Sequence, residues 1–327
     1  MKVGKVPTEV LEEIIFKNIL HKRSEILVRP GIGEDCAVVD FGENVCVMST
    51  DPITGAVKDI GSLSIHISCN DVASNGVEPV GVMMTILAPV GTTKEDLDYV
   101  MKEANKAAAS INVEIIGGHS EITDAVNRMV ITTTAVGIQK KDSMVTSKGA
   151  KAGDAIIMTK HAGLEGTAII AADLEDRLKG KIEPKIIEDA RGFSEDISVV
   201  KEGILAGEIG VNSMHDVTEG GLLGALWELA EASKVGIEIY EKRIPIRPET
   251  SAICKALSID PLRLISSGVM VMAVSPEKKQ RLVDTFQKEG IAATEIGKII
   301  EGERVLVKNS IRQVLEAPEI DELYKVI

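Results

Sequence analysis

Five short segments of the sequence place carboxylates beside glycine, serine, threonine or asparagine. They read GIGED at 31–35, STD at 49–51, ND at 70–71, GGHSE at 117–121 and HDVTEGG at 215–221. An acid at the end of a strand is most often a cap or a turn residue, so each segment alone is a weak signal. Their ordered occurrence along one chain favours a single site built from several loops, because loops carry functional groups more often than helix faces do.

The adjacent Asn70 and Asp71 form the most informative pair. They lie within SLSIHISCNDVASNGV, an otherwise apolar or small stretch that predicts a helix over 60–74. A buried amide and a buried carboxylate are costly unless they are paired or coordinate an ion. We therefore expect this pair to be functional, and we expect His66 in the same helix to be a satisfied core residue.

Carboxylates on separate loops suit a magnesium–phosphate site. Mg²⁺ prefers oxygen ligands and is held by a few carboxylates, several waters and the phosphate oxygens of a substrate. Glycines allow backbone N–H groups to approach those phosphates. Other familiar motifs are absent from the sequence, among them the P-loop, the complete dinucleotide fingerprint, the G-x-S-x-G elbow and H-E-x-x-H. The sequence thus predicts that ATP binds through Mg²⁺.

The composition narrows the class of partner. The chain has 327 residues, 37 Lys and Arg against 50 Asp and Glu, and a net charge of −13. Such an acidic chain with 2% aromatic residues is a poor candidate for binding nucleic acid or an anionic membrane. The four cysteines form no CxxC pair, so we expect reduced, buried thiols and no metal cluster. The sequence has no signal-like start and no apolar run of membrane-spanning length, which favours a cytoplasmic protein.

Hydrophobic periodicity predicts strands and helices mixed in both halves, hence an α/β or α+β fold. A capping box at Thr92 and Glu95 is expected to open a helix that ends near residue 111. The polar, lysine-rich stretch 139–153 marks a domain boundary, which gives domains 1–148 and 149–327. The other predicted helices are 8–22, 60–74, 166–178, 196–206, 220–233 and 276–289, and the predicted strands are 36–39, 45–49, 80–87, 113–116, 129–138, 155–159, 237–240, 269–274 and 295–300.

The segments GIGEDCAVV, STDPITGAVKDIG, NDVASNGVEP, GGHSEIT and HDVTEGGLLGAL resemble the aminoimidazole ribonucleotide (AIR) synthase superfamily. The resemblance spans about residues 4–307 and is closest to HypE-like, AIR synthase-related proteins, including DPLRLISSG at 260–268. It implies a two-domain PurM-like fold. The N-terminal domain would have a mixed sheet with helices on one face, and two such sheets would form a dimeric β-barrel. The C-terminal domain would be α+β, and ATP would lie in a cleft with Mg²⁺.

The resemblance also implies roles for individual residues. It makes Asp35, Asp51 and Asp71 metal ligands, and it replaces a further ligand carboxylate by His119, with Glu121 as a substitute. Asp216 and Glu219 would lie near metal. The expected catalytic residues are Asp71, His119 and Asp216, and the expected nucleotide contacts are Gly33, Ser49, Thr50, Asn70, Gly117, Gly118, Ser120 and Thr218.

The resemblance implies a Mg-ATP-dependent enzyme that activates an oxygen of an unidentified small molecule, by phosphorylation or phosphate-assisted dehydration. HypE proteins carry their substrate on a C-terminal cysteine. This sequence ends DELYKVI and its last cysteine is Cys254, so we do not expect that reaction in the HypE manner. The alternative is a catalytically silent, ATP-binding scaffold or regulator in a maturation complex with a maturation-protein partner. Candidates for binding anionic or phosphate groups are Lys2, Lys5, Arg128, Lys160 and His161.

Overall fold

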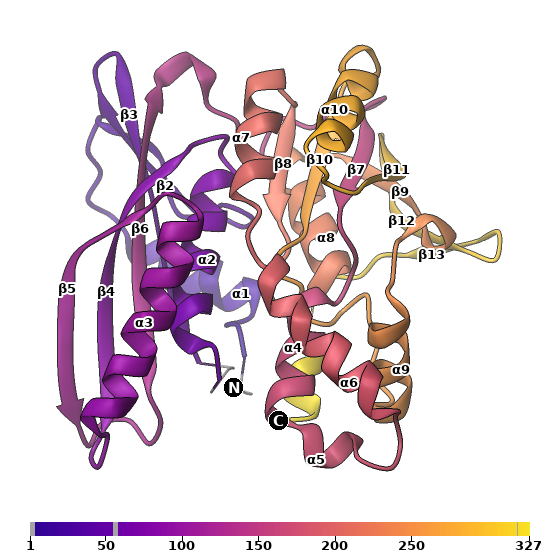
Figure 1. The fold of residues 1–327 in the computed structure, drawn as a ribbon. Helices are drawn as coiled ribbons and strands as arrows, with labels where there is room; N and C mark the ends of the chain where they lie inside the picture. The colour runs from indigo at the N-terminus through magenta and orange to yellow at the C-terminus, as the bar shows by residue number, and fades with distance from the viewer. Residues whose placement is uncertain (1–3, 55–57, 319) are drawn as a thin grey trace.

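The computed structural model describes residues 4–54, 58–318 and 320–327. Its two halves lie side by side, and each is built around one sheet (Figure 1). The first sheet contains β1 (Ile26–Val28), β2 (Ala37–Phe41), β3 (Asn44–Ile53), β4 (Pro79–Pro89), β5 (Glu114–Thr123) and β6 (Val130–Lys140). The second contains β7 (Ala155–Thr159), β8 (Ser213–Asp216), β9 (Gly236–Tyr240), β10 (Met270–Val274), β11 (Ala293–Ile300), β12 (Arg304–Lys308) and β13 (Ile311–Val314).

The first sheet is mixed, with strand order β1-β2-β3-β6-β4-β5. Only the pairing of β4 with β5 is parallel among the described pairs of this sheet. Helices α2 (Ile60–Ala73) and α3 (Lys94–Ser110) cover the face that looks toward the second half (Figure 1). The apolar residues of α2 are packed from both sides, which explains why nearly the whole helix is buried. The expected mixed sheet with helices on one face is therefore confirmed.

The second sheet has the order β13-β12-β9-β11-β7-β10-β8 and is antiparallel except for the pair β9–β12. Strands β7, β8 and β10 are buried along their full length, because helices pack on both of their faces. The helices of this half are α4 (Leu164–Asp173), α5 (Glu175–Leu178), α6 (Pro184–Arg191), α7 (Val200–Ile209), α8 (Gly221–Ser233), α9 (Pro248–Leu257) and α10 (Pro276–Lys288). The two-domain α/β and α+β fold class is confirmed.

Three local predictions are wrong. The predicted helix 8–22 is a short α-turn, α1 (Thr8–Val10), followed by one π-helical and one 3₁₀ turn that end at Asn18. The capping box before α3 uses Thr93 and Asp96, because the Thr93 hydroxyl accepts the Asp96 amide hydrogen while the Asp96 carboxylate accepts the Thr93 amide hydrogen. The segment 117–121 is a continuation of β5 and not a loop after it.

Three further expectations concern the domain boundary, the cysteines and membrane-spanning segments. The first sheet uses residues 26–140 and the second 155–314; the predicted boundary at 148/149 falls between them and stays a prediction. All four cysteines are free thiols; Cys36, Cys69 and Cys254 are buried as expected, whereas Cys46 is only partly buried. None of the described helices is long and apolar enough to cross a membrane.

Candidate functional site

Strand β3 and helix α2 bring the first carboxylates together. Side chains of a strand alternate between its two faces, so Ser49 and Asp51 point to one side and Thr50 to the other. Ser49 Oγ lies 2.6 Å from Asp71 Oδ2 on α2, 3.1 Å from the carbonyl oxygen of Asp35 and 3.4 Å from Asp51 Oδ2. Asp71 is buried. A single hydroxyl thus joins the predicted STD and ND segments to the GIGED segment.

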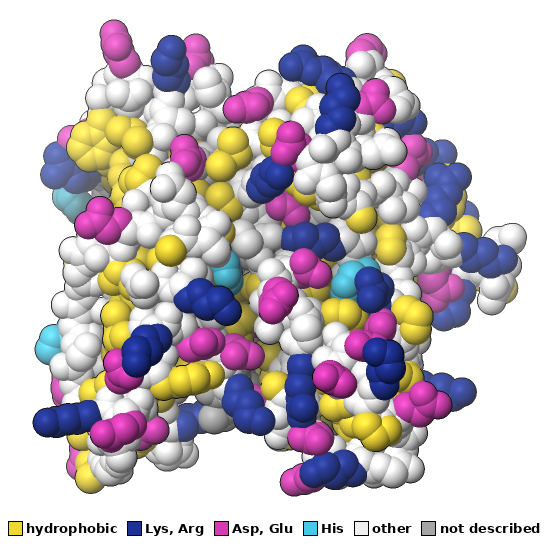
Figure 2. All heavy atoms as spheres, in the orientation of Figure 1, with side chains coloured by type: hydrophobic (Ala, Val, Ile, Leu, Met, Phe, Trp, Pro, Cys, Tyr) yellow, Lys and Arg dark blue, Asp and Glu magenta, His cyan; other side chains and the backbone are white. Residues whose placement is uncertain are grey.

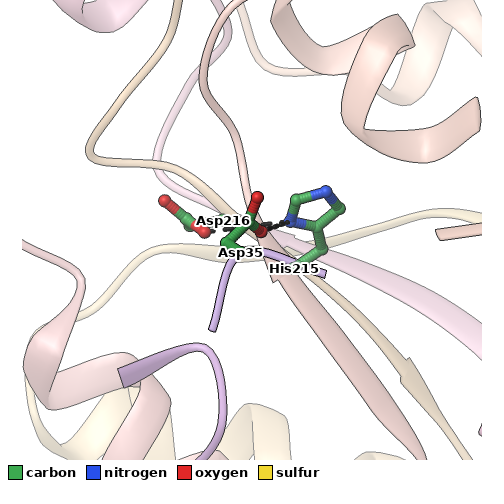
Figure 3. Close-up of side chains that lie close together, drawn as sticks. All are labelled: Asp35, His215 and Asp216. Atoms are coloured by element: carbon green, nitrogen blue, oxygen red, sulfur yellow. Dashed lines mark ion pairs between the residues drawn. The ribbon is translucent and has the colours of Figure 1, made fainter. Parts of the chain in front are cut away.

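The second domain completes this cluster with the end of β8. The carboxylates of Asp35 and Asp216 lie beside the imidazole of His215 (Figure 3). His215 Nδ1 is 3.2 Å from Asp35 Oδ2 and 3.8 Å from Asp216 Oδ1. One ligand atom from each of these three residues lies within 4.8 Å of the others. We call Asp35, Asp51, Asp71 and Asp216 the carboxylate cluster.

Burial and mutual repulsion disfavour the ionised forms of the acids in the carboxylate cluster. Burial raises the pKa of Asp35 to about 6, with the Asp216 charge adding to the rise and the His215 imidazole opposing it. Burial also raises the pKa of Asp71 well above its ordinary value, and the Asp216 and Asp51 charges contribute. Neither oxygen of buried Asp216 has a hydrogen-bond partner within the described part of the chain, and Asp35 Oδ2 is contacted only by the His215 imidazole among the described residues, in an ion pair. Acidic oxygens without donors are the ligands that Mg²⁺ prefers, so the residues fit a magnesium ion.

A chain of charged groups extends the cluster away from the predicted metal ligands. His215 Nε2 lies 3.2 Å from Glu228 on α8, and Glu228 lies 3.0 Å from the ammonium of Lys5. Burial opposes ionisation of each group, but their mutual attraction prevails. The pKa of His215 is raised well above its usual range, chiefly by Asp35, and His215 and Lys5 lower the pKa of Glu228 to about 2. His215 is therefore an internal cation that partly neutralises the acids.

Glu219 occupies a different position from the one expected. Its carboxylate accepts hydrogen bonds from the Lys5 backbone N–H at 3.1 Å and from the Tyr324 hydroxyl at 2.7 Å. It therefore joins an N-terminal and a C-terminal segment of the chain, and no contact to the carboxylate cluster appears among the described residues. Thr218 contributes its carbonyl to the turn before α8, where it accepts the N–H of Gly221 at 3.1 Å.

Three other predicted nucleotide contacts, Asn70, Gly33 and Thr50, make contacts within the protomer, and their role toward a nucleotide stays a prediction. Asn70 is fully buried, and its amide bridges the two domains by donating to Ile197 O and accepting from Val199 N, both at 2.8 Å. Gly33 has φ +68°, and a Cβ there would meet Glu228 O at 3.1 Å. Thr50 is exposed on the opposite face of β3 and accepts a hydrogen bond from Thr134.

The GGHSE segment is not brought to the carboxylate cluster. Gly117, Gly118, His119, Ser120 and Glu121 are exposed on β5, the edge strand of the first sheet, and His119 Nε2 lies 3.3 Å from Glu121 Oε2. Gly118 has a packing reason, since a Cβ there would lie 1.8 Å from the Met84 carbonyl oxygen of β4. Within one protomer, the expected metal role of His119 and Glu121 therefore has no geometric support.

Glu228 is not among the residues singled out from the sequence. Lys2, which is among them, lies outside the described residues. The sequence does contain a signal for Glu228. It is a carboxylate within GLLGALWELAEAS, a helix whose other buried residues are small or apolar, and its side chain is only 7% exposed. A buried acid on an apolar helix requires a partner, as Asn70 and Asp71 did.

Comparison with known proteins agrees with this arrangement. The N-terminal domain of AIR synthase related proteins matches residues 33–139, and the C-terminal domain of the same proteins matches 151–308. A protein of Methanocaldococcus jannaschii, provisionally named a hydrogenase expression/formation protein, is 32% identical over 99% of this chain and 97% of its own length. The carbamoyl dehydratase HypE of Cupriavidus necator is 30% identical over 80% of this chain and 75% of its own.

Solved structures show the same fold. HypE in its complex with HypF covers 94% of this chain and 99% of its own, with a TM-score of 0.78 at 22% identity. HypE in complex with ATP covers 98% and 97%, with a TM-score of 0.74 at 22% identity. Two matching domain models and a full-length relative settle the family: the chain belongs to the AIR synthase related proteins and is similar to hydrogenase maturation proteins of the HypE type.

Proposed function

We propose that this protein is a Mg-ATP-dependent enzyme that activates an oxygen of a small molecule, by phosphorylation or by phosphate-assisted dehydration. The observation that carries the proposal is the carboxylate cluster, to which both domains contribute and whose buried Asp216 oxygens have no donor among the described residues. An acidic site of this kind binds a triphosphate only with cations between them.

The chain's own residues have distinct tasks in this proposal. Asp35 of the first domain and Asp216 of the second would hold magnesium, and Asp51 and Asp71 would supply further carboxylates beside it. Ser49 fixes the rotamer of Asp71 through its 2.6 Å contact. His215, held between Asp35 and Glu228, limits the repulsion among the acids. Bound Mg-ATP would supply the transferable phosphoryl group, and positioning with charge neutralisation is most of what such a transfer requires.

The relatives favour dehydration over simple phosphorylation. Several relatives that match 80% or more of this chain are named carbamoyl dehydratase HypE, including the one from Cupriavidus necator. The ATP complex of HypE and the complex of AaThiL with AMPPCP and TMP share this fold, so nucleotide binding is compatible with it. The acceptor of this chain stays unidentified, because no described residue selects one acceptor class at the carboxylate cluster.

We also propose a homodimer formed through the first sheet. Its outer face is incompletely covered, since Val80, Met83, Ile116 and Ile122 are each at least half exposed. The edge strand β5 offers unpaired backbone groups beside them, which a second sheet would satisfy. A maturation-protein partner is a further proposal, supported by the complex of HypE with HypF.

The alternative is a catalytically silent, ATP-binding scaffold. The observation that favours it is the position of His119 and Glu121 on exposed β5, where they provide no ligand to the carboxylate cluster of the same protomer. A scaffold of this kind would bind Mg-ATP without turning it over.

Isothermal titration with a non-hydrolysable ATP analogue, with and without Mg²⁺, tests the proposal. We expect binding that requires Mg²⁺ and is lost in Asp216→Asn, while the control Asp98→Asn on the exposed surface of α3 binds as wild type does. Phosphate release in the presence of candidate acceptors then separates enzyme from scaffold. Binding that is independent of Mg²⁺, or is unaffected by Asp216→Asn, would contradict the metal site.

A further inference from the structure

A hollow lies where the two domains meet, on the side of α2 away from the carboxylate cluster. It has a volume of about 930 Å³, and its walls come from α2, the end of α3, the segment after β7, α7 and the turn before β11. Figure 2 shows histidine, basic and acidic side chains meeting across the centre of this face. This volume is at the upper end of the range typical of small-molecule sites, which are often found at domain interfaces. We call it the interdomain cavity.

Two buried imidazoles line the interdomain cavity. His66 from α2 and His161 from the segment after β7 are each only 8% exposed, and the Nδ1 atom of each has no hydrogen-bond partner in the described part of the chain. His66 is buried as expected, but it lines a cavity and its Nδ1 has no partner among the described residues. Burial lowers the pKa of each imidazole to about 4, helped by Lys160 for His66 and by Arg247 for His161. Each of these nitrogens therefore offers a hydrogen-bonding position to a group in the cavity.

The basic groups of the cavity are held in fixed positions. The ammonium of Lys160 donates to the carbonyl oxygens of Asp196 and Ser198 and pairs with Glu202 at 2.8 Å. Lys160 also has φ 52°, a left-handed conformation that non-glycine residues rarely adopt. Such backbone strain persists only where the surroundings enforce it, and it is concentrated at functional sites.

Arg247 provides the free cationic donors at the mouth of the cavity. Its guanidinium lies 5.4 Å from the centre of the Phe193 ring, and the same ring meets His161 edge-on at 4.7 Å. Only Nε of Arg247 has a partner among the described residues, Glu249 at 3.3 Å. The two terminal nitrogens can therefore receive an oxyanion in a bidentate manner.

The interdomain cavity is separate from the carboxylate cluster. His66 and Asp71 are both on α2, but five residues apart they differ by about 140° around the helix and by about 7.5 Å along it. Their side chains thus point to different sides of α2. An occupant of the cavity would not share the phosphate positions of the carboxylate cluster.

We propose that the interdomain cavity is a second small-molecule site, which takes a compound that combines an oxyanion group, phosphate or carboxylate, with hydrogen-bonding groups. Arg247 receives the oxyanion, and the imidazoles of His66 and His161 make hydrogen bonds deeper in the cavity. Three acids line the cavity, and they do not oppose this, because Glu202 is paired with Lys160 and both Glu195 and Asp196 are exposed to solvent.

Imidazole ¹H–¹⁵N spectra of the full chain, in EDTA and without nucleotide, test the proposal with inorganic phosphate and with acetate as separate probes. EDTA keeps the carboxylate cluster free of cations, so that it repels either anion. The chain has five histidines, and His66→Asn and His161→Asn assign the two relevant signals. We expect saturable shifts of His66 and His161 at constant ionic strength while His215 does not move. Saturation by phosphate alone indicates a phosphate ester as occupant, and saturation by acetate alone indicates a carboxylic acid.

The matched pair of variants is Arg247→Gln and Arg243→Gln. Arg243 also lies over an aromatic ring, Tyr240 at 4.5 Å, and also pairs with a glutamate, but it does not line the cavity. We expect Arg247→Gln to weaken binding about ten-fold or more and Arg243→Gln to leave it unchanged. Shifts that never saturate, equal affinities in both variants, or a response confined to other histidines would overturn the proposal.

Discussion

The two sides of α2 carry ionisable groups of opposite type, acids on one side and bases on the other. The carboxylate cluster collects acids whose burial raises the pKa of Asp35 and Asp71, whereas the interdomain cavity collects bases whose burial lowers the pKa of His66 and His161. Both leave buried polar atoms unpaired. The difference teaches what each region can bind: a cation would relieve the charge of the first, and the neutral imidazoles of the second offer hydrogen bonds to a polar compound.

The largest expected effect comes from Asp71→Asn. Burial and neighbouring acids disfavour the ionised carboxylate, so we expect the amide to raise the free energy of unfolding of the metal-free protein at neutral pH. The same change should weaken Mg²⁺-dependent binding of a non-hydrolysable ATP analogue about 100-fold or more, because it removes an anionic oxygen ligand. Thermal unfolding and titration measure the two effects. A variant with wild-type Mg²⁺ dependence would remove Asp71 from the metal site.

The next expected effect concerns Asn70, which connects the two regions. Asn70→Ala removes both hydrogen bonds to Ile197 and Val199, the segment that also anchors Lys160 at the interdomain cavity. With two buried backbone groups left unpaired, we expect a loss of about 2–5 kcal/mol in the free energy of unfolding.

The same variant should expose the Val199 amide to hydrogen exchange. Ser68→Ala is the control, since Ser68 makes its hydrogen bond to Thr133 within the first domain and we expect the Val199 amide to stay protected there. Unchanged exchange at Val199 in Asn70→Ala would show that the two domains are held together by other contacts.

The opposite signs of the two regions can be separated by pH. His66 has a folded pKa of about 4 against an ordinary value of 6.5, so its contribution to stability is present above pH 6.5 and is lost as the pH falls toward 4, by about 3 kcal/mol in full. Asp35 acts in reverse: its folded pKa of about 6 makes stability fall as the pH rises from 3.8 through 6.

His66→Asn should therefore remove the His66 share of the acid-side loss, while His161, whose pKa is also lowered to about 4, keeps its own share. Urea unfolding of the metal-free protein between pH 4 and 7 measures this, with His21→Asn at an exposed position as the control. If His66→Asn and wild type lose stability in parallel on acidification, His66 is not the buried neutral base that the structure indicates.

Much of the carboxylate cluster follows from local sequence. The polar Asn70–Asp71 pair is recognisable from the sequence because burying it in an apolar helix is costly. Helix α2 lies nearly where the hydrophobic periodicity predicts it. Strand alternation separates Ser49 from Thr50 once β3 is known, but the sequence alone gave both the same role. The motif does not show that consecutive strand residues such as Ser49 and Thr50 point to opposite faces of the sheet.

The GGHSE segment and the interdomain cavity depend on contacts between residues far apart in the chain, and no local sequence pattern indicates those contacts. The GGHSE segment predicts a loop after a strand, yet Gly118 lies within β5 and is required because β5 approaches Met84 of β4 too closely for a Cβ. The neutral imidazoles of the interdomain cavity come from different domains, so neither His66 nor His161 carried a local pattern that linked it to the other. Their lowered pKa values depend on burial that only the assembled domains create.

The smallest expected effect distinguishes the two faces of β3. Ser49→Ala removes the hydroxyl that contacts Asp71 Oδ2 at 2.6 Å, and we expect a loss of about 1 kcal/mol in folding free energy and roughly five- to ten-fold weaker Mg²⁺-dependent nucleotide binding. Thr50→Ala is the matched control, because its neighbouring hydroxyl contacts Thr134 on the exposed face. Titration of both variants is decisive for the comparison. Equal weakening by the two changes would mean that the exposed face of the first sheet also reaches the nucleotide, which in this fold requires a second copy of the chain to supply it.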